Sequence, residues 1–274
     1  MSGDPFVYPG TNVLRNKKGL RDPAKLEQLE AQATTMRIAG LESVPIPGSF
    51  DLDHLKAVHR HIFQDVYPWA GHLREGTGIM TKERLGARVI YGNSDHVAAE
   101  AARLLRLLQC ENRLQGLGAP AFAGRLAFYY SELDAVHPFR EGNSRTLRVF
   151  TAQIAQQAGH TLDWSAVGQS EDARNALYRA RDAAVMAGVT GPLETLVTQA
   201  LTPKRNAAAT IADAMRSSGP ASPKPWEPPP VPMAERVRIF EGRLKADKGP
   251  ASKAEEKPGP EPDDRPKPRS GPKP

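Results

Sequence analysis

Cysteine is almost absent from this chain, since Cys110 is the only one in 274 residues. A single thiol cannot form an internal disulfide or supply a cysteine cluster for a metal ion. Long apolar runs are missing too, and no stretch reaches the roughly 18 apolar residues of a membrane-spanning helix. The first residues show no basic segment followed by an apolar one, so no Sec-type signal is expected. We therefore predict a soluble, cytoplasmic protein with no membrane partner.

Charge of one sign is only mildly in excess, and the formal net charge is +6. A basic protein can bind nucleic acid through its phosphates. Here, however, Lys and Arg are scattered among acidic residues, and no RRM or zinc-finger signature occurs. We predict no direct nucleic-acid partner.

Composition divides the chain into three parts. Residues 1–21 mix aromatics, Gly, Pro and Asn, which is typical of an extended arm. Residues 22–205 carry helical patterns and form one predicted globular domain. Residues 216–274 are rich in Pro, Lys, Ser, Glu and Asp, and such a segment buries too little apolar surface to offset its ordering entropy. Within this predicted disordered tail, residues 233–246 are amphipathic and form a candidate docking helix.

Apolar residues at helical spacing predict a mainly α domain. The first helix is expected to be capped by Asp22, to begin at Pro23 and to end near Gly40. Further helices are expected from about 51, from a cap at Ser94 or Asp95 to 114, over 121–136, from 143 or 144 to 159, over 170–187 and over 192–200.

The helical pattern fails between residues 74 and 93. Two short β-prone runs, 78–81 and 87–91, are separated by a charged turn, which predicts a β-hairpin. Three histidines precede it on the second helix: His54, His59 and His61. No two of them are three or four residues apart, so we interpret them as structural or exposed residues and not as metal ligands.

Residues 137–148 read HPFREGNSRTLR and concentrate groups suited to phosphate chemistry. His137 offers an imidazole that can take a proton near neutral pH. Glu141 offers a carboxylate suited to Mg²⁺. Gly142 permits a tight turn into a helix whose first amides favour an anion. On that helix Arg145 and Arg148 lie one turn apart, and their planar guanidinium groups match phosphate oxygens.

Proline follows His137 directly and restricts its backbone, so we expect the preceding helix to stop there with His137 in extended geometry. The motif is then a loop between two helices.

This string resembles the signature of the Fic/DOC family, HPFx(D/E)GN(G/K)RxxR, and departs from it only at Ser144. The segment YPWAG at residues 67–71 also resembles the region that precedes the flap in this family. The resemblance implies a Fic-type helical bundle over residues 22–205. It also implies a hairpin flap at about 75–92 that lies over the active-site loop at 137–148 and clamps an extended target chain by backbone pairing.

The activity that the resemblance implies is AMPylation, the transfer of AMP from ATP to a hydroxyl side chain of a target protein. His137 would be the base, and Glu141 would hold Mg²⁺ on the α- and β-phosphates. The nucleotide would be bound by Gly142, Asn143, Ser144, Arg145 and Arg148. Among these, Asn143 would orient the α-phosphate and Arg145 the outer phosphates. Arg148 would meet the terminal phosphate or an inhibitory glutamate.

Ser144 leaves three alternatives open. If its backbone must be left-handed, serine costs about 1–2 kcal/mol relative to glycine. Its hydroxyl can instead donate a hydrogen bond to phosphate. The chain is thus an active transferase, a slower or altered one, or a degraded member that binds nucleotide and partner without transfer.

Partners follow from the family's regulation. Its inhibitory motif, (S/T)xxxE(G/N), has no full match in this chain, which implies a small separate antitoxin and a bacterial toxin–antitoxin module. Targets in that branch point to DNA gyrase or topoisomerase IV. A different hypothesis takes the basic, Pro-rich tail as a signal for export of an effector through a conjugation-type secretion system.

Overall fold

The computed structural model describes residues 3–167 and 170–203. The tail predicted at 216–274 and its candidate docking helix at 233–246 lie outside the described residues. The predicted division into arm, domain and tail therefore stays a prediction.

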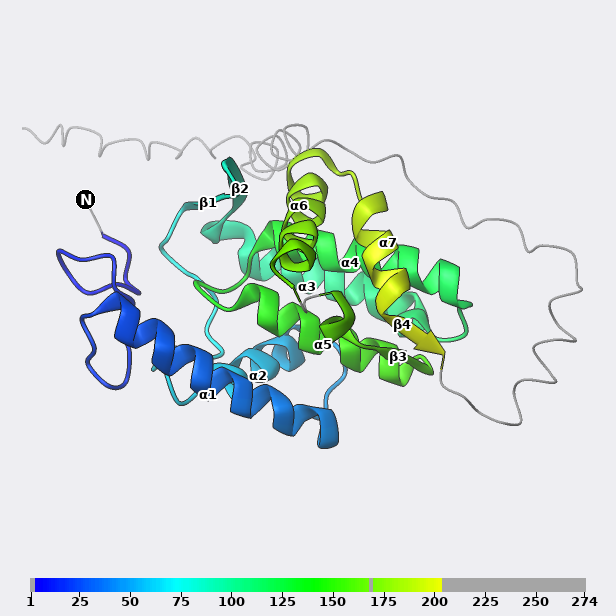
Figure 1. The fold of residues 1–274 in the computed structure, drawn as a ribbon, viewed down its shortest axis with the longest axis horizontal. Helices are drawn as coiled ribbons and strands as arrows, with labels where there is room; N and C mark the ends of the chain where they lie inside the picture. The colour runs from blue at the N-terminus through cyan, green and yellow to red at the C-terminus, as the bar shows by residue number, and fades with distance from the viewer. Residues whose placement is uncertain (1–2, 168–169, 204–274) are drawn as a thin grey trace, which may run out of the picture. The chain divides into compact units, whose positions relative to one another are not determined.

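Helices make up most of the described residues (Figure 1). In chain order they are α1 (Pro23–Ser43), α2 (Leu52–Phe63), α3 (Ser94–Cys110), α4 (Ala119–Val136), α5 (Asn143–Gln157), α6 (Glu171–Ala187) and α7 (Gly191–Ala200), with short 3-10 turns at Asn112–Leu114 and Trp164–Val167. The prediction of a mainly α fold is confirmed. None of these helices combines the length and the apolar character that a membrane span requires.

Two small antiparallel sheets accompany the helices. Strand β1 (Ile79–Arg84) pairs with β2 (Ala87–Asn93), and β3 (His160–Leu162) pairs with β4 (Leu201–Pro203). The first sheet is the predicted hairpin, with strands slightly longer than expected. The second joins two three-residue segments about 40 positions apart, and segments this short carry no alternation that a sequence reading can detect.

The observed N-terminal caps agree with the predicted helix starts at two helices and differ from the prediction at a third. The Asp22 carboxylate accepts hydrogen bonds from the first amides of α1, and Asp51 caps α2. Helix α3 is capped by the Asn93 side chain, so the predicted cap at Ser94 or Asp95 is wrong. The Ser94 hydroxyl is occupied elsewhere, because it accepts a hydrogen bond from the Gly78 N–H at 2.9 Å and so joins α3 to the base of the hairpin.

Helix α4 is the central element, and it packs against α3, α5, α6 and α7. Phe122, Leu126, Tyr130 and Leu133 follow one another along it and are fully buried. Removing each such side chain from water contributes roughly 1.5–3 kcal/mol. Because α4 is apolar on several faces, it must be surrounded by other elements. The residues that follow its C-terminus therefore lie inside the protein.

The hairpin is fastened to α6. Its two-residue turn has positive φ at Leu85 (51°) and Gly86 (78°), the backbone that suits a tight hairpin. Next to the turn, Arg84 forms an ion pair with Asp182 of α6. Val89 and Tyr91 of β2 belong to a small apolar cluster with residues of α4 and α6. The hairpin thus has one face against the domain.

Arg74 joins the hairpin to the end of α4. Its side chain is fully buried and uses all five N–H donors. Nε donates to the carbonyl of His137 at 2.6 Å, and one terminal nitrogen donates to the carbonyl of Val136 at 3.1 Å. The remaining donors reach the carbonyls of Gly78 and Gly92 and the Thr77 hydroxyl. Burial lowers the pKa of Arg74 to about 10, so the group stays charged at neutral pH.

Arg74→Met should therefore destabilise the fold. The substitution leaves several buried carbonyls without a donor, and we expect a loss of about 3 kcal/mol in the free energy of unfolding. Urea denaturation followed by circular dichroism measures it. The matched control is Arg37→Met, which removes a half-exposed ion pair with Asp65 and should cost less than about 1 kcal/mol. Equal losses in the two variants would contradict the role given to Arg74.

Candidate active site

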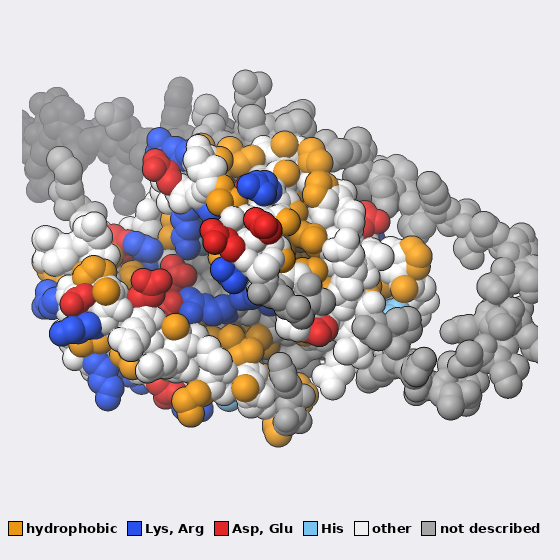
Figure 2. Space-filling model, viewed as in Figure 1, with side chains coloured by type: hydrophobic (Ala, Val, Ile, Leu, Met, Phe, Trp, Pro, Cys, Tyr) orange, Lys and Arg blue, Asp and Glu red, His pale blue; other side chains and the backbone are white. Residues whose placement is uncertain are grey.

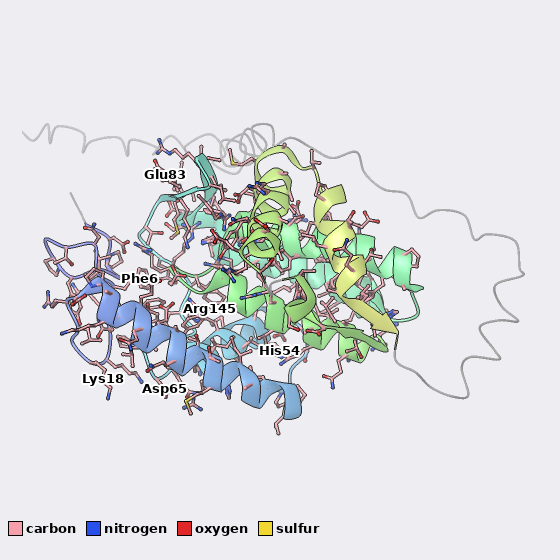
Figure 3. The ribbon with its side chains drawn as sticks, in the orientation of Figure 1. Phe6, Lys18, His54, Asp65, Glu83 and Arg145 are labelled. Carbon is pink, nitrogen blue, oxygen red and sulfur yellow. The ribbon has the colours of Figure 1, made fainter. Side chains whose placement is uncertain are left out.

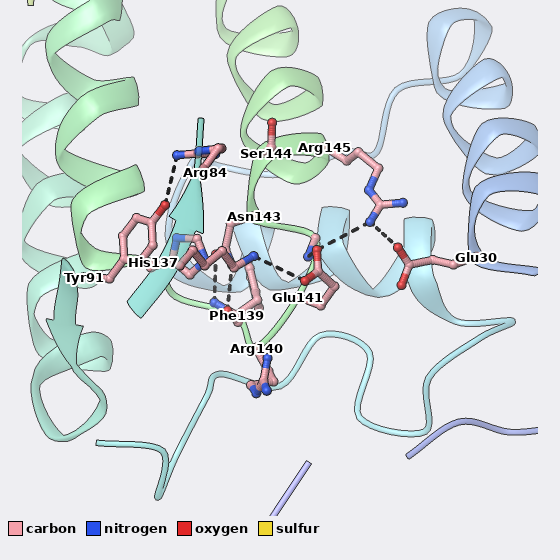
Figure 4. A network of polar contacts seen from close by, with 12 residues as sticks. Glu30, Arg84, Tyr91, His137, Phe139, Arg140, Glu141, Asn143, Ser144 and Arg145 are labelled. Atoms are coloured by element: carbon pink, nitrogen blue, oxygen red, sulfur yellow. Dashed lines mark hydrogen bonds and ion pairs between the residues drawn. The ribbon is translucent and has the colours of Figure 1, made fainter. Parts of the chain in front are cut away.

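The motif at 137–148 comprises the connection between α4 and α5, residues 137–142, and the first residues of α5 (Figure 4). His137 is the C-terminal cap of α4, with its N–H donating to the Leu133 carbonyl at 3.0 Å. Its backbone is left-handed, with φ 52° and ψ 64°, so the predicted extended geometry is wrong. Proline disfavours the right-handed helical conformation for the residue before it, so His137 cannot continue the helix. This restriction does not decide between the extended and the left-handed conformation. The helix still ends where predicted.

The His137 side chain is enclosed, with 2% of its surface exposed. The Tyr91 ring from β2 stacks on it at 3.8 Å between centroids. Nδ1 lies 3.7 Å from Oδ1 of Asp134, too far for a hydrogen bond. Neither ring nitrogen has a hydrogen-bond partner among the described residues. Burial lowers the pKa of His137 to about 4 although Asp134 opposes the shift. At neutral pH the imidazole is neutral and can accept a proton.

His59 on α2 contacts the loop through a hydrogen bond and a ring stack. Its Nδ1 accepts a hydrogen bond from the Gly71 N–H at 2.8 Å, so the ring proton is on Nε2. That nitrogen donates to the Glu141 carbonyl at 3.1 Å, and the ring stacks on Phe139 at 3.9 Å. Burial lowers the pKa of His59 to about 3. The structural role predicted for this histidine is confirmed, but its tie to the motif was not foreseen.

His54 is the second structural histidine, and it belongs to the core (Figure 3). It accepts from the Phe50 N–H at 3.2 Å and contacts the Ile46 carbonyl at 3.0 Å.

Asn143 braces the loop with its side chain. Its Nδ2 donates to the Phe139 carbonyl at 2.6 Å, and its Oδ1 accepts from the Phe139 N–H at 2.9 Å. The amide oxygen and one amide N–H are therefore used within the loop. The predicted role of Asn143 in orienting the α-phosphate stays a prediction. As a first-turn residue of α5, Asn143 still has a backbone N–H without an acceptor inside the helix.

Gly142 is required by both conformation and space. Its φ is 84°, in the left-handed region. A Cβ added there would meet the Phe63 ring at 2.2 Å, well inside van der Waals contact. No other residue type can therefore bring the start of α5 this close to α2.

Glu141 is an ionised carboxylate with 29% of its side chain exposed. Lys82 of β1 lies 3.3 Å from Oε2, and the Gly142 N–H donates to Oε1 at 2.9 Å. Although burial opposes ionisation, Lys82 and the Gly142 N–H together lower the pKa of Glu141 to about 2. Mg²⁺ that accompanies a nucleotide commonly takes one or two carboxylates plus phosphate oxygens and water. A single ionised, partly exposed carboxylate fits that requirement.

Arg145 and Arg148 differ in their partners. Arg145 lies between α5 and α1 (Figure 3), where it pairs with Glu30 and donates to the Thr34 hydroxyl at 3.2 Å. Arg148 donates to the Ser144 carbonyl at 3.4 Å and forms no ion pair with any residue that the structure describes. Figure 2 shows that Lys and Arg side chains line a hollow on this face of the domain, with acidic side chains near them.

Ser144 lies within α5 and has no positive φ. The left-handed strain considered for serine at this position is therefore absent. Its hydroxyl accepts a hydrogen bond from Nη1 of Arg181 at 3.0 Å. Arg181 belongs to α6 and also binds Asp134, the acid beside His137. Neither residue was predicted from the sequence. Asp134, three positions before His137, was within reach of a spacing argument, whereas Arg181 shows no local signal.

This arrangement, a neutral imidazole and an ionised carboxylate around the start of a helix, is suited to phosphate. The profile of the Fic/DOC family matches residues 49–155, which include the motif. Protein adenylyltransferase VbhT from Bartonella schoenbuchensis is 38% identical over 173 residues, which are 63% of this chain and 35% of that protein. A probable protein adenylyltransferase Fic from Salmonella typhimurium is 36% identical over 164 residues, 60% of this chain and 78% of that protein. The chain belongs to the Fic/DOC family.

A solved structure agrees with this assignment. The BepC protein from Bartonella tribocorum, a VirB-translocated effector with bound AMPPNP, superposes with a TM-score of 0.65 and 27% identity. The match covers 73% of this chain and 97% of that one. The Fic-type helical fold predicted from the motif is confirmed. The matched region spans about a third of the length of VbhT.

The two demands on Gly142 are separable by mutation. Gly142→Ala should lower the melting temperature, because the methyl group clashes with Phe63. Gly86→Ala is the matched control: it also has positive φ, but nothing lies within 4 Å of the added Cβ. The control should cost only the left-handed strain of about 1–2 kcal/mol. Thermal melting followed by circular dichroism compares the two, and similar losses would show that the Phe63 contact is unimportant.

Proposed function

We propose that this chain is a protein adenylyltransferase, which transfers AMP from ATP to a hydroxyl side chain of a target protein. The observation that carries the proposal is the neutral, buried His137 at one end of a loop whose other end is the N-terminus of α5. The names of the relatives and the AMPPNP in the BepC structure support a nucleotide as the substrate.

Proton transfer begins the proposed reaction. A ring nitrogen of His137 takes the proton of the target hydroxyl, and the oxygen forms a bond to the α-phosphorus of ATP. The bond from that phosphorus to the oxygen bridging to the β-phosphate breaks, and pyrophosphate leaves with the electron pair. The product is a phosphodiester between AMP and the target side chain. Such a transfer depends on positioning and charge neutralisation.

The phosphates would be bound by the start of α5. The N–H groups of its first turn have no acceptors within the helix, and the helix dipole favours an anion there. The Gly142 N–H is occupied by Glu141, which leaves the amides of Asn143, Ser144 and Arg145 for the nucleotide. Arg148 has no acid partner among the described residues, and Arg145 would exchange Glu30 for a phosphate oxygen.

Glu141 would hold Mg²⁺, which supplies neutralisation of phosphate charge when bound. The carboxylate now contacts Lys82 of β1. A cation at Glu141 would compete with that contact, so loading the nucleotide is coupled to the position of the hairpin. The exposed edge of β1, including Ile79 at 62% exposure, would pair with an extended segment of the target.

Two finer proposals concern the biological setting. A toxin restrained by a separate antitoxin, acting on DNA gyrase or topoisomerase IV, follows from the family resemblance. Export as an effector is supported by the description of BepC as VirB-translocated. A non-catalytic binding protein was the alternative suggested by Ser144. The helical backbone and the bonded hydroxyl of this residue favour an active enzyme.

His137→Ala tests the base directly. Loss of a positioned base lowers rates by about 10²–10⁴-fold, so transfer of label from ATP labelled at the α-phosphate should almost vanish. His61→Ala, on the same protein but outside the loop, is the control and should retain activity. Intact mass of the target distinguishes AMP from phosphate as the transferred group. Undiminished labelling by His137→Ala would exclude this residue as the base.

The pH dependence provides a second test. Because the pKa of His137 is lowered to about 4 from 6.5, the base form should persist well below neutral pH. We expect kcat/KM to stay constant from pH 7 to about pH 5 and to fall only near the lowered pKa. Circular dichroism at each pH must accompany the assay. His59 and His137 have lower pKa values in the folded state than in the unfolded chain, so stability is lost as pH falls below about 6.5.

A fall in kcat/KM that is centred near pH 6.5 in protein that is still folded would contradict a buried, neutral base.

A further inference from the structure

A buried ion pair lies directly behind the motif. Arg181 of α6 and Asp134 of α4 are both almost fully buried, at 2% and 0% exposure. Two parallel hydrogen bonds join them, from Nε to Oδ2 at 2.9 Å and from Nη2 to Oδ1 at 2.8 Å. Although burial opposes ionisation, Arg181 holds the pKa of Asp134 below its usual range. The carboxylate therefore stays charged inside the protein.

The third nitrogen of Arg181 reaches the phosphate end of the site. Nη1 donates to the Ser144 hydroxyl at 3.0 Å. Ser144 lies in the first turn of α5, and Asp134 lies in the last turn of α4. One planar guanidinium group thus connects the two helix ends that border the loop. A glycine at 144 would leave this donor without its partner.

His137 is the other neighbour of the pair. Its Nδ1 lies 3.7 Å from Asp134 Oδ1, and no described residue hydrogen-bonds to either ring nitrogen. Lys82 and Arg181 contribute positive charge around the ring, and Asp134 contributes negative charge.

The surroundings of the ring include two further titratable groups. Tyr91 covers the ring, and Glu141 lies within electrostatic range of it. Of the acidic groups, Asp134 has an oxygen within ion-pair distance of Nδ1. A shift of less than 1 Å would turn this approach into a hydrogen bond.

We propose that Arg181 is a positioning residue for the transfer reaction: it aims the Asp134 carboxylate at Nδ1 of His137 and, through the Ser144 hydroxyl, holds the start of α5 at a set distance from that base. The inference rests on the proposed adenylyltransferase function. With Nδ1–H directed at Asp134, Nε2 is left to take the proton of the target hydroxyl. In this proposal Ser144 contributes to the reaction by accepting the hydrogen bond from Arg181.

A double-mutant cycle tests the link to Ser144. Ser144→Ala and Ser144→Gly should each lower kcat by about tenfold with little change in KM for ATP, and Arg181→Lys should do the same. The double variant Ser144→Ala, Arg181→Lys should be no slower than the slower single variant, because contacting residues in one network are not additive. Arg179→Lys, at an exposed position two residues before Arg181 on α6, is the matched control and should leave kcat within about twofold.

Higher kcat in Ser144→Gly, or additive losses in the double variant, would overturn the proposal.

The titration of His137 distinguishes a positioning role of Arg181 from a role in packing alone. Nuclear magnetic resonance of the imidazole should report a lower pKa of His137 in Asp134→Asn, since a negative charge is lost. In Arg181→Gln the pKa should rise, since a positive charge is lost. Shifts of opposite sign support the proposal, whereas shifts of the same sign or none in folded protein overturn it. Where Arg181→Gln does not fold, Asp134→Asn and the kinetic cycle decide.

Failure of the two proposals can be told apart. If the wild-type chain transfers no AMP to any target, the proposed function fails, and the imidazole titration still tests the geometry. If the wild type is active but neither the cycle nor the titration responds, only the role of Arg181 is lost.

Discussion

The arrangement of this site depends on one buried guanidinium group, that of Arg74. It binds the carbonyls of Val136 and His137 at the end of α4 and those of Gly78 and Gly92 at the base of the hairpin. Buried carbonyls need donors, and a planar group with five donors can satisfy several at once. The hairpin therefore cannot move far from the end of α4 at its base.

Around that constraint, core residues set the shape of the loop. His59 and Asn143 form hydrogen bonds with backbone groups of the loop, and Phe63 fills the space that a side chain at position 142 would need. The groups proposed for chemistry are thus carried by a rigid loop, while Glu141 pairs with Lys82 on β1 and Arg145 pairs with Glu30 on α1. In the proposed reaction Mg²⁺ would replace the first partner and a phosphate oxygen the second. Rigid positioning with exchangeable charge partners is what a transfer reaction requires.

Sequence reasoning found the helices, the hairpin and the motif because each has a local signal. Asp22 and Asp51 are typical N-cap residues that mark the starts of α1 and α2, and the motif from His137 to Arg148 is continuous in the chain. It went wrong at Asn93 and at the backbone of His137, where several conformations satisfy the same local rule. It missed Arg181 and Glu30 altogether, since their partners lie 37 or more positions away.

The amino-acid sequence by itself determined the class of fold, the family signature and the order of the chemical groups in the loop. These properties depend on residues close together in the chain, where periodicity and spacing are informative. Only the tertiary structure decided that His137 is buried and neutral, that Ser144 is helical, and that its hydroxyl is bonded to Arg181. Burial and charge pairing are properties of neighbours in space, and α6 meets α4 and α5 only once the domain has packed.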